Sequence, residues 1–288
     1  MSSNILADSE VRKRRNISSV AIRTILILFL LVNVYPLIFV LLTSLKSTSD
    51  FLGNIWSLPK VFVWKNYAEA WIDGHIGEYF INSIIVTSIS LSVILVIGSL
   101  AGYALAKMNV PGTGFIIIVM LVLITIPAES LVIPLYIMMV KMRIINTIYL
   151  PLIITYIGWT LPFSIVVLKN FFESFSSTLL EAARLDGSGE LNTFVKIVVP
   201  LMMPAIGTVV VFNFCSIWGE LMWARIATAS VDRGLTLTCG LLAFKGEYDT
   251  NWGPMSAAIC IILIPLIVMF LALQNYFVEG LTTGAVKG

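Results

Sequence analysis

Charged residues divide this sequence into long apolar runs. Each run is at least 21 residues long, and an apolar helix needs roughly 20 residues to cross the hydrocarbon core of a bilayer. The pattern therefore predicts an all-α integral membrane protein with six membrane-spanning helices. The stretches without Asp, Glu, Lys, Arg or His hold about half of the 288 residues and lie at 24–45, 79–106, 108–128, 144–168, 197–219 and 250–278.

Turn residues and charges at the ends of these runs set the expected limits of the spans. We expect one membrane domain over 20–278, between an N-terminal tail at 1–19 and a C-terminal tail at 279–288. Pro127 and Pro134 are expected to kink the third span, because proline removes a backbone donor. The spans are expected at about 22–42, 79–106, 115–140, 149–168, 201–224 and 255–277.

Basic residues indicate the orientation. Four of them, at 12–15, precede the first span, and Lys and Arg accumulate on the cytoplasmic side of membrane proteins. Six spans then place both termini and the loop 169–200 in the cytoplasm, and the loops 45–77 and 225–254 outside. The aromatic residues of loop 45–77 are expected to form a belt at the membrane interface, with stacking against a sugar as the alternative.

Composition narrows the class of protein further. Hydrophobic residues make up 58% and charged residues 12%, whereas soluble domains carry about 25% charged residues, so a cytosolic globule is excluded. The net charge of +2 gives no reason to expect nucleic acid as a partner. Three cysteines without paired spacing and the single histidine, His75, predict neither a disulfide framework nor a metal site.

The loop 169–200 carries the most informative polar pattern. Thr178 and Glu181 have the spacing of a capping box, at the start of a short helix expected over 179–185. Asp186-Gly187 is expected to end that helix, because glycine accepts the left-handed conformation found there. A second helix is expected over 190–199, leading to Pro200 at the membrane.

The short helix has the features of a docking element. Ala182 and Ala183 add little side-chain bulk, so that a groove of another protein could close around the helix. Glu181, Arg184 and Asp186 would then fix its register through charged hydrogen bonds. The loop therefore predicts a cytoplasmic protein partner.

The same residues resemble a known family. Glu181, Ala182, Ala183, Gly187, Ile197 and Pro200 match the pattern E-A-A-x3-G-x9-I-x-L-P of ABC importer permeases, with Val199 in place of the usual leucine. The resemblance to the maltose-type carbohydrate permeases, and to their smaller permease subunit, extends over nearly the whole chain. It is carried by Asn66-Tyr67-x3-Trp71, Asn82-Ser83, Gly102-Tyr103-Ala104, Ile126-Pro127, Ile133-Pro134-Leu135-Tyr136, Asn146-Thr147 and the C-terminal segment 274–288.

This resemblance implies the transmembrane domain of a type I ABC importer in a bacterial plasma (inner) membrane. It implies a second permease subunit, two ATPase subunits, and an extracytoplasmic solute-binding protein that delivers a sugar. The chain would be no enzyme and would bind no cofactor, since it has no G-x-x-x-x-G-K-[ST] motif and ATP and Mg belong to the ATPases. The residues implied to couple to the ATPase are Glu181, Ala182, Ala183, Arg184, Asp186, Gly187, Ile197 and Pro200.

Two acids within the apolar part of the chain are candidates for the translocation path. Glu129 and Glu220 lie next to uncharged runs, and carboxylates at membrane depth usually face the bundle interior or an aqueous cavity. Trp218 and Asn213 precede Glu220 and could offer an aromatic face and a hydrogen-bonding group to a sugar. The alternatives are a contact between subunits for Glu129, and a substrate held mainly by the second permease.

Other functions remain as alternatives. The same kind of importer could carry a non-sugar solute such as glycerol phosphate. A secondary transporter would predict inverted repeats or several buried acids, and an intramembrane enzyme would predict a cluster of catalytic side chains within the spans. The sequence contains neither pattern.

Overall fold

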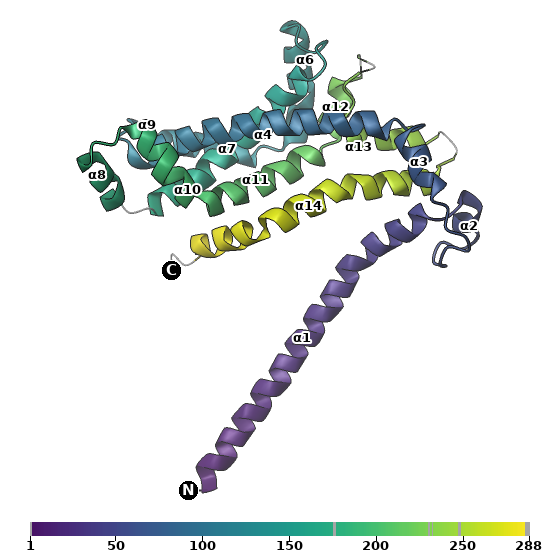
Figure 1. The fold of residues 1–288 in the computed structure, drawn as a ribbon, viewed down its shortest axis with the longest axis horizontal. Helices are drawn as coiled ribbons and strands as arrows, with labels where there is room; N and C mark the ends of the chain where they lie inside the picture. Colours follow the sequence, from purple (N-terminus) through teal and green to yellow (C-terminus); the bar gives the residue numbers. More distant parts are fainter. Residues whose placement is uncertain (1, 175–176, 230, 232, 247–248, 286–288) are drawn as a thin grey trace.

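The computed structural model describes residues 2–174, 177–229, 231, 233–246 and 249–285 (Figure 1), and among these it leaves the side chains of 2–19, 177, 184 and 278–285 undescribed. Every element assigned in the described residues is a helix, apart from one isolated bridge between Lys245 and Thr250. The prediction of an all-α chain is confirmed. The long elements are α1 (Ser2–Ser44), α4 (Ile76–Lys107), α5 (Thr113–Thr125), α6 (Val132–Lys141), α7 (Leu150–Ser174), α11 (Met203–Trp218) and α14 (Trp252–Ala285).

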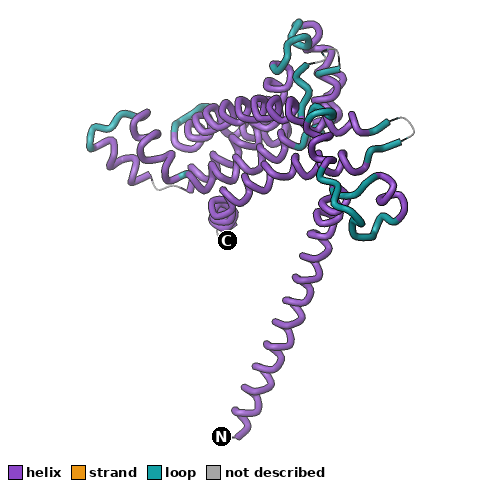
Figure 2. Tube along the Cα trace, turned by 45° about the vertical axis from the view of Figure 1, so that its right-hand side comes forward, coloured by secondary structure: helices purple, strands orange, loops and turns teal. Residues whose placement is uncertain are grey.

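Short helices lie at the two ends of the bundle that α4, α7, α11 and α14 form (Figures 1 and 2). We call these ends the α3 end and the α8 end. The α3 end carries α2 (Thr48–Gly53), α3 (Lys65–Trp71), α12 (Met222–Ala227) and α13 (Leu237–Gly240). The α8 end carries α8 (Ser177–Leu185), α9 (Glu190–Thr193), a π-helical segment (Phe194–Val198) and α10 (Val199–Leu201).

The apolar runs correspond to four continuous helices and two bent pairs. Four helices are long and apolar enough to span a membrane, at Val20–Ser44, Ile76–Lys107, Leu150–Ser174 and Trp252–Phe277. The two bent pairs would raise the number of spans to six, in agreement with the sequence pattern.

The third predicted span, 115–140, is wrong as a continuous helix. α5 and the segment Ala128–Lys141, which comprises η1 (Ala128–Leu131) and α6, meet at an angle of 91°. Ile126 is extended (φ −75°, ψ 122°), as expected for a residue directly before proline, so Pro127 breaks the helix. Pro134 is tolerated because it lies in the first turn of α6, where the backbone N–H groups have no helical acceptor.

The fifth predicted span, 201–224, is also wrong at one end. α11 ends at Trp218, and Glu220 and Leu221 separate it from α12. At its start, α11 is bent by 75° from the segment Glu190–Leu201. The expected C-terminal tail at 279–288 is not separate from the last span, because α14 continues to Ala285. Residues 286–288 lie outside the described part.

Glycines allow α4 and α7 to pack closely. A Cβ atom on Gly102 would lie 3.1 Å from the backbone nitrogen of Lys169 and 3.2 Å from Leu168 Cβ. Gly98, one turn away, faces Ser164. Small residues let helices approach closely in lipid, and these glycines lie where α4 packs against α7 inside the bundle.

α1 leaves the bundle. Its last turns pack near the start of α14, and the rest diverges from the other helices (Figures 1 and 2). None of its most apolar window is buried within the chain, so most of the apolar surface of this helix contacts no other part of the chain.

Candidate functional site

The short helix of the cytoplasmic loop forms as expected. α8 spans Ser177–Leu185, and Gly187 follows it with φ +77°. The N–H of Ser188 donates to the carbonyl of Ala183 at 2.9 Å, which is the pairing of a left-handed glycine cap. Thr178, predicted as the N-cap, is the second residue of α8, and residues 175–176 before the helix lie outside the described part, so the capping box stays a prediction.

α8 has one buried and one exposed face. Leu180 and Ala183 are 3% and 6% exposed, and Leu180 packs in a cluster with Phe172 and Phe194. Glu181, Ala182 and Asp186 are exposed, as a docking element requires. The side chain of Arg184 lies outside the described residues.

The cluster under α8 joins several helices. The cluster includes Tyr103 of α4, Leu168 and Phe172 of α7, Met202 directly before α11, and Val209 within α11. Tyr103 meets Phe172 and Phe194 edge to face, with ring centroids 5.6 and 5.2 Å apart. Close-packed side chains transmit displacement because the interior is barely compressible. The cluster therefore attaches α8 to α4, α7 and the start of α11.

The segment after α8 departs from the expected helix 190–199. It begins with α9, continues as a π-helical turn at Phe194–Val198 and ends in α10 at Leu201. Ile197 is half-buried in the π turn and Pro200 is exposed in α10. Neither Pro200 nor Pro204 can donate a helical hydrogen bond, and the chain bends between them.

A surface hollow of about 540 Å³ adjoins this segment, with exposed apolar residues at its rim. Leu191 is 71% and Val195 55% exposed, in the segment Glu190–Leu201 that meets α11 at the 75° bend. The hollow is lined by Gly189, Glu190, Leu191, Asn192, Val195 and Lys196.

Glu220 sits at the break between α11 and α12. Its carboxylate accepts the Tyr156 hydroxyl at 2.8 Å and the backbone N–H groups of Trp223 and Ala224 at 2.7 and 2.9 Å. It thus caps the N-terminus of α12, where N–H groups lack helical partners, and ties it to α7. Sequence reasoning missed Tyr156, although a tyrosine inside an uncharged run signals a hydroxyl that needs a partner.

Trp218 and Asn213 are both buried. Asn213 Nδ2 donates to Ser164 Oγ of α7 at 2.8 Å and to Val209 O at 2.9 Å. Trp218 donates through Nε1 to Ile262 O of α14 at 3.1 Å and stacks on Phe214, with ring centroids 5.3 Å apart. The two side chains therefore brace α11 against its neighbours on either side.

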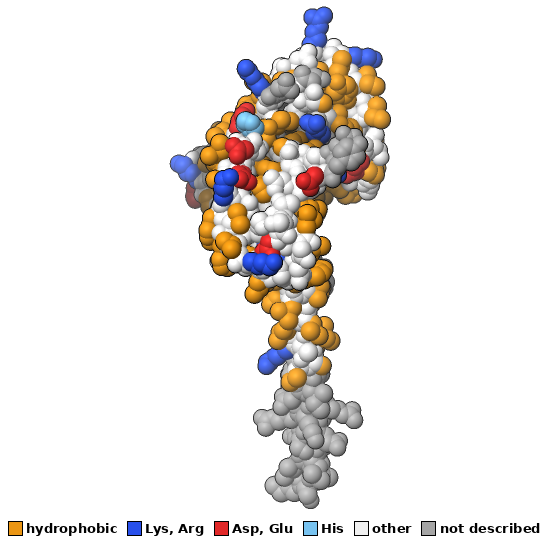
Figure 3. All heavy atoms as spheres, turned by 90° about the vertical axis from the view of Figure 1, so that its right-hand side faces the viewer, with side chains coloured by type: hydrophobic (Ala, Val, Ile, Leu, Met, Phe, Trp, Pro, Cys, Tyr) orange, Lys and Arg blue, Asp and Glu red, His pale blue; other side chains and the backbone are white. Residues whose placement is uncertain are grey.

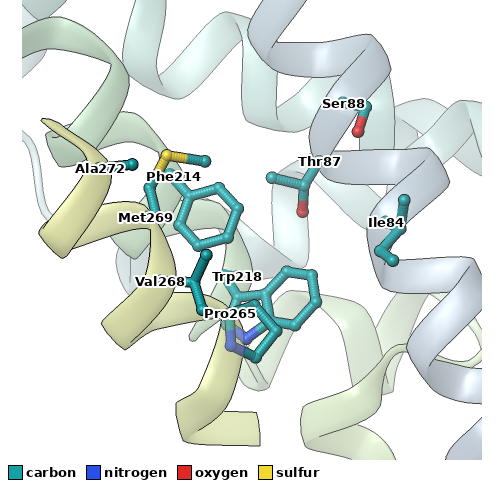
Figure 4. Close-up of a pocket in the computed structure, with 9 residues that line it drawn as sticks. All are labelled: Ile84, Thr87, Ser88, Phe214, Trp218, Pro265, Val268, Met269 and Ala272. Carbon is teal, nitrogen blue, oxygen red and sulfur yellow. The ribbon is translucent and has the colours of Figure 1, made fainter. Parts of the chain in front are cut away.

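Trp218 also forms part of an apolar groove. The groove has a volume of about 250 Å³ and lies between α4 and α14, with Trp218 and Phe214 from α11 at its floor (Figure 4). Thr87 and Ser88 supply its hydroxyl groups, and its other lining residues are Ile84, Pro265, Val268, Met269 and Ala272. Such a lining suits an acyl chain or a helix better than a sugar, whose hydroxyls need hydrogen-bonding partners when buried.

Glu129 lies apart from these residues. It is exposed, in η1, at the right-angled break between α5 and α6. The four path candidates thus occupy three surroundings: a helix cap, a buried brace and an exposed break. In the described residues, no group of three or more His, Cys, Asp or Glu side chains is placed to hold a metal.

Asn82 and Ser83 hold the segment before α13. Asn82 Nδ2 donates to Leu235 O at 3.0 Å, and Ser83 Oγ accepts the N–H of Leu237 at 2.7 Å. The Tyr149 hydroxyl donates to Asn82 Oδ1 at 2.7 Å and fixes the amide. The sequence singled out Asn82 and Ser83 through resemblance alone, since their partners are backbone groups more than 150 residues away.

Comparisons with known proteins all point to one family. A sequence profile described as "Binding-protein-dependent transport system inner membrane component" matches residues 94–283. A diacetylchitobiose uptake system permease protein of Streptomyces coelicolor is 32% identical over 265 residues, which cover 91% of this chain and 87% of that protein. A trehalose/maltose transport system permease protein of Thermococcus litoralis is 34% identical over 265 residues, covering 91% and 94%.

A solved structure has the same fold. A bacterial ABC transporter involved in the import of the acidic polysaccharide alginate contains a chain that superposes with a TM-score of 0.76, at 23% identity, over 91% of this chain and 97% of that one. The type I importer fold expected from the sequence is therefore confirmed.

Proposed function

Because the chain belongs to the family of binding-protein-dependent transport system inner membrane components, we propose that it helps to carry a sugar or oligosaccharide into the cytoplasm as one permease subunit of an ATP-driven importer. The names of its relatives support the substrate class, since they include diacetylchitobiose, trehalose and maltose. A non-sugar solute such as glycerol phosphate remains the competing substrate.

The observation that carries this proposal is the construction of the α8 end. α8 exposes Glu181 and Asp186 while Leu180 and Ala183 attach it to the bundle. An ATPase subunit that grips the exposed face would move α8 as a rigid lever. Two such ATPases would hold ATP and Mg, and this chain would supply no catalytic group.

The geometry suggests how the lever acts. The cluster around Phe172 and Phe194 couples α8 to α4, α7 and α11. Packed interfaces respond to a push by switching between discrete arrangements rather than by deforming. Closure of the ATPase pair would therefore rotate these helices together and change which end of the path is open.

The α3 end is the proposed outer face. Both termini and α8 would lie in the cytoplasm, and a solute-binding protein would dock on the loops that carry α2, α3, α12 and α13. A second permease would complete the path, together with the lipid bilayer around α1. The predicted path residues within this chain remain Glu220, Trp218, Asn213 and Glu129. All of them except Glu129 also hold helices in place.

The test is ATP hydrolysis by the reconstituted complex of both permeases, both ATPases and the binding protein. Diacetylchitobiose, trehalose, maltose and raffinose would be compared with glycerol 3-phosphate as stimulants. Stimulation by at least one sugar is expected. A response to glycerol 3-phosphate with none to any sugar would contradict the substrate class and leave the importer assignment standing.

A further inference from the structure

The loop between α2 and α3 exposes an unusual number of apolar side chains. We call residues 52–64 the apolar loop. Six of its large side chains are at least 60% exposed: Leu52, Trp56, Leu58, Val61, Phe62 and Trp64. Figure 3 looks onto this end of the molecule and shows hydrophobic side chains exposed between the bundle and α1. Exposed apolar patches outside the spans mark a binding surface.

A buried ammonium holds this loop in place. Lys46 is 1% exposed, and its Nζ donates to the carbonyls of Asn54 at 3.1 Å and Ile55 at 3.0 Å, with Ser57 Oγ at 3.4 Å. The backbone N–H of Val63 donates to Leu45 O at 2.9 Å and closes the loop onto the end of α1. The apolar side chains are therefore presented by a fixed backbone.

The helix that leads into the apolar loop, α2, is attached to the bundle. Phe51 is 6% exposed and stacks on Trp252 at the start of α14, with ring centroids 5.1 Å apart. Asp50 accepts the N–H of Lys60 at 3.0 Å, and its side chain is 8% exposed. Asp50 and Lys60 are the only charged residues between 47 and 64, so the exposed side of the loop is nearly free of charge.

The loop folds back along the unburied surface of α1. Trp56 stacks on Tyr35 with ring centroids 6.1 Å apart and lies 5.5 Å from the ring of Phe39. Tyr35 lies nine residues before the last residue of α1, which is about 13 Å along a helix. Trp56 therefore lies beside a helix long and apolar enough to span a membrane and itself unburied, and the apolar loop continues the exposed apolar surface of α1.

We propose that the apolar loop is an interfacial anchor that lies in the outer leaflet of the bilayer, at the level of the headgroups and the first acyl carbons. Tryptophan favours this level, and lysine beside it can extend its ammonium to water. The irregular backbone excludes a deeper position, because unpaired N–H and C=O groups are not tolerated in hydrocarbon. The anchor and the Lys46 clamp together fix the height of the outer end of α1, the helix that otherwise diverges from the bundle.

Two surroundings other than lipid are possible for the apolar loop, and the test has to distinguish all three. A solute-binding protein would leave the loop in water until it docks, and the second permease would cover it with protein. Nitroxide labels at Leu58→Cys and Phe62→Cys, in a chain with Cys215, Cys239 and Cys260 replaced by Ala, distinguish the three. The complex of both permeases and both ATPases is placed in vesicles of phosphatidylcholine and phosphatidylglycerol without binding protein. Val32→Cys serves as the lipid reference and Lys245→Cys as the water reference.

We expect labels at 58 and 62 to collide several-fold more with oxygen than with a water-soluble nickel chelate, as at Val32 and unlike Lys245. Equal access to both reagents at 58, as at Lys245, would place the loop in water and overturn the proposal. Low access to both would place it under protein and overturn it as well. The added substitution Lys46→Met is expected to increase the mobility of the label at 58.

A second measurement keeps the test valid if the chain without cysteines does not fold. Tryptophan fluorescence of the complex with native cysteines is quenched by lipids brominated near the headgroup or near the chain end. Wild type and Trp56→Phe are compared, so that their difference reports Trp56. Stronger quenching by the shallow bromine is expected. No difference in quenching by either lipid would contradict the proposal.

Discussion

The Tyr156 hydroxyl on α7 donates a 2.8 Å hydrogen bond to Glu220, two residues beyond the end of α11. The same carboxylate accepts two backbone N–H groups at the start of α12, and Thr238 Oγ1 donates to the Glu220 carbonyl at 2.6 Å. Glu220, just beyond the end of α11, is thus joined to α7, α12 and α13. Any route for solute past Glu220 has to be compatible with this structural role.

Glu220→Ala is expected to lower the free energy of unfolding by about 2–3 kcal/mol, since it removes charge-assisted hydrogen bonds from three donors. Tyr156→Phe is expected to cost about 1 kcal/mol, because one bond is lost and the carboxylate keeps the other two. Denaturant titration in mixed micelles measures both. The exposed Glu129→Ala is the matched control, and an equal effect of Glu129→Ala and Glu220→Ala would contradict the capping role.

Gly102→Val is expected to destabilise the protein by about 1–3 kcal/mol, because the added carbons overpack the contact between α4 and α7. A Cβ at this position would already lie 3.1 Å from Lys169 N. Gly114→Val is the control, since nothing lies within 4 Å of a Cβ there. Thermal unfolding of both variants in the same detergent measures the difference, and equal midpoints would refute the close packing of α4 and α7.

Gly187→Ala tests the cap of α8. Gly187 has φ +77°, a conformation that costs other residues roughly 1–2 kcal/mol, so α8 should open more often. Hydrogen exchange over residues 177–188 is expected to accelerate about tenfold, which is the change in equilibrium that 1.4 kcal/mol produces. Gly189, with φ −69°, gives the control Gly189→Ala; equal exchange in both variants would argue against the strained turn.

Asn82→Leu and Ser83→Ala are expected to release the segment before α13. Cys239 on α13 is 5% exposed, and burial raises the pKa of its thiol above the usual value, so a thiol reagent should react slowly with it. A membrane-impermeant maleimide added from outside is expected to label Cys239 faster in both variants. Ser92→Ala, whose hydroxyl donates only to Ser88 O of its own helix, should leave the rate unchanged. Unaltered labelling in all three variants would show that Asn82 and Ser83 do not hold the segment.

The sequence predicted what local patterns determine. Uncharged runs located the spans, and Asp186-Gly187 ended α8. Glu181 and Ala182 are exposed as a docking face requires, but Ala183, expected on the same face, is buried. Pro127 carried the signal for the break in the third span, but the size of the bend depends on what α5 and α6 pack against. The capping of α12 by Glu220 and the burial of Lys46 were beyond sequence reasoning, because their partners lie in segments that only the tertiary structure brings together.

The importer assignment rests on the attachment of α8 to an ATPase, and coupling of ATP hydrolysis to uptake tests it most directly. Sugar uptake and ATP hydrolysis are measured in vesicles that hold the whole complex, with Glu181→Arg compared against Asp73→Arg, an exposed charge reversal at the α3 end. We predict that Glu181→Arg abolishes uptake and its stimulation of ATP hydrolysis while the chain remains inserted in the membrane, and that Asp73→Arg retains both. Normal uptake in Glu181→Arg would contradict the account.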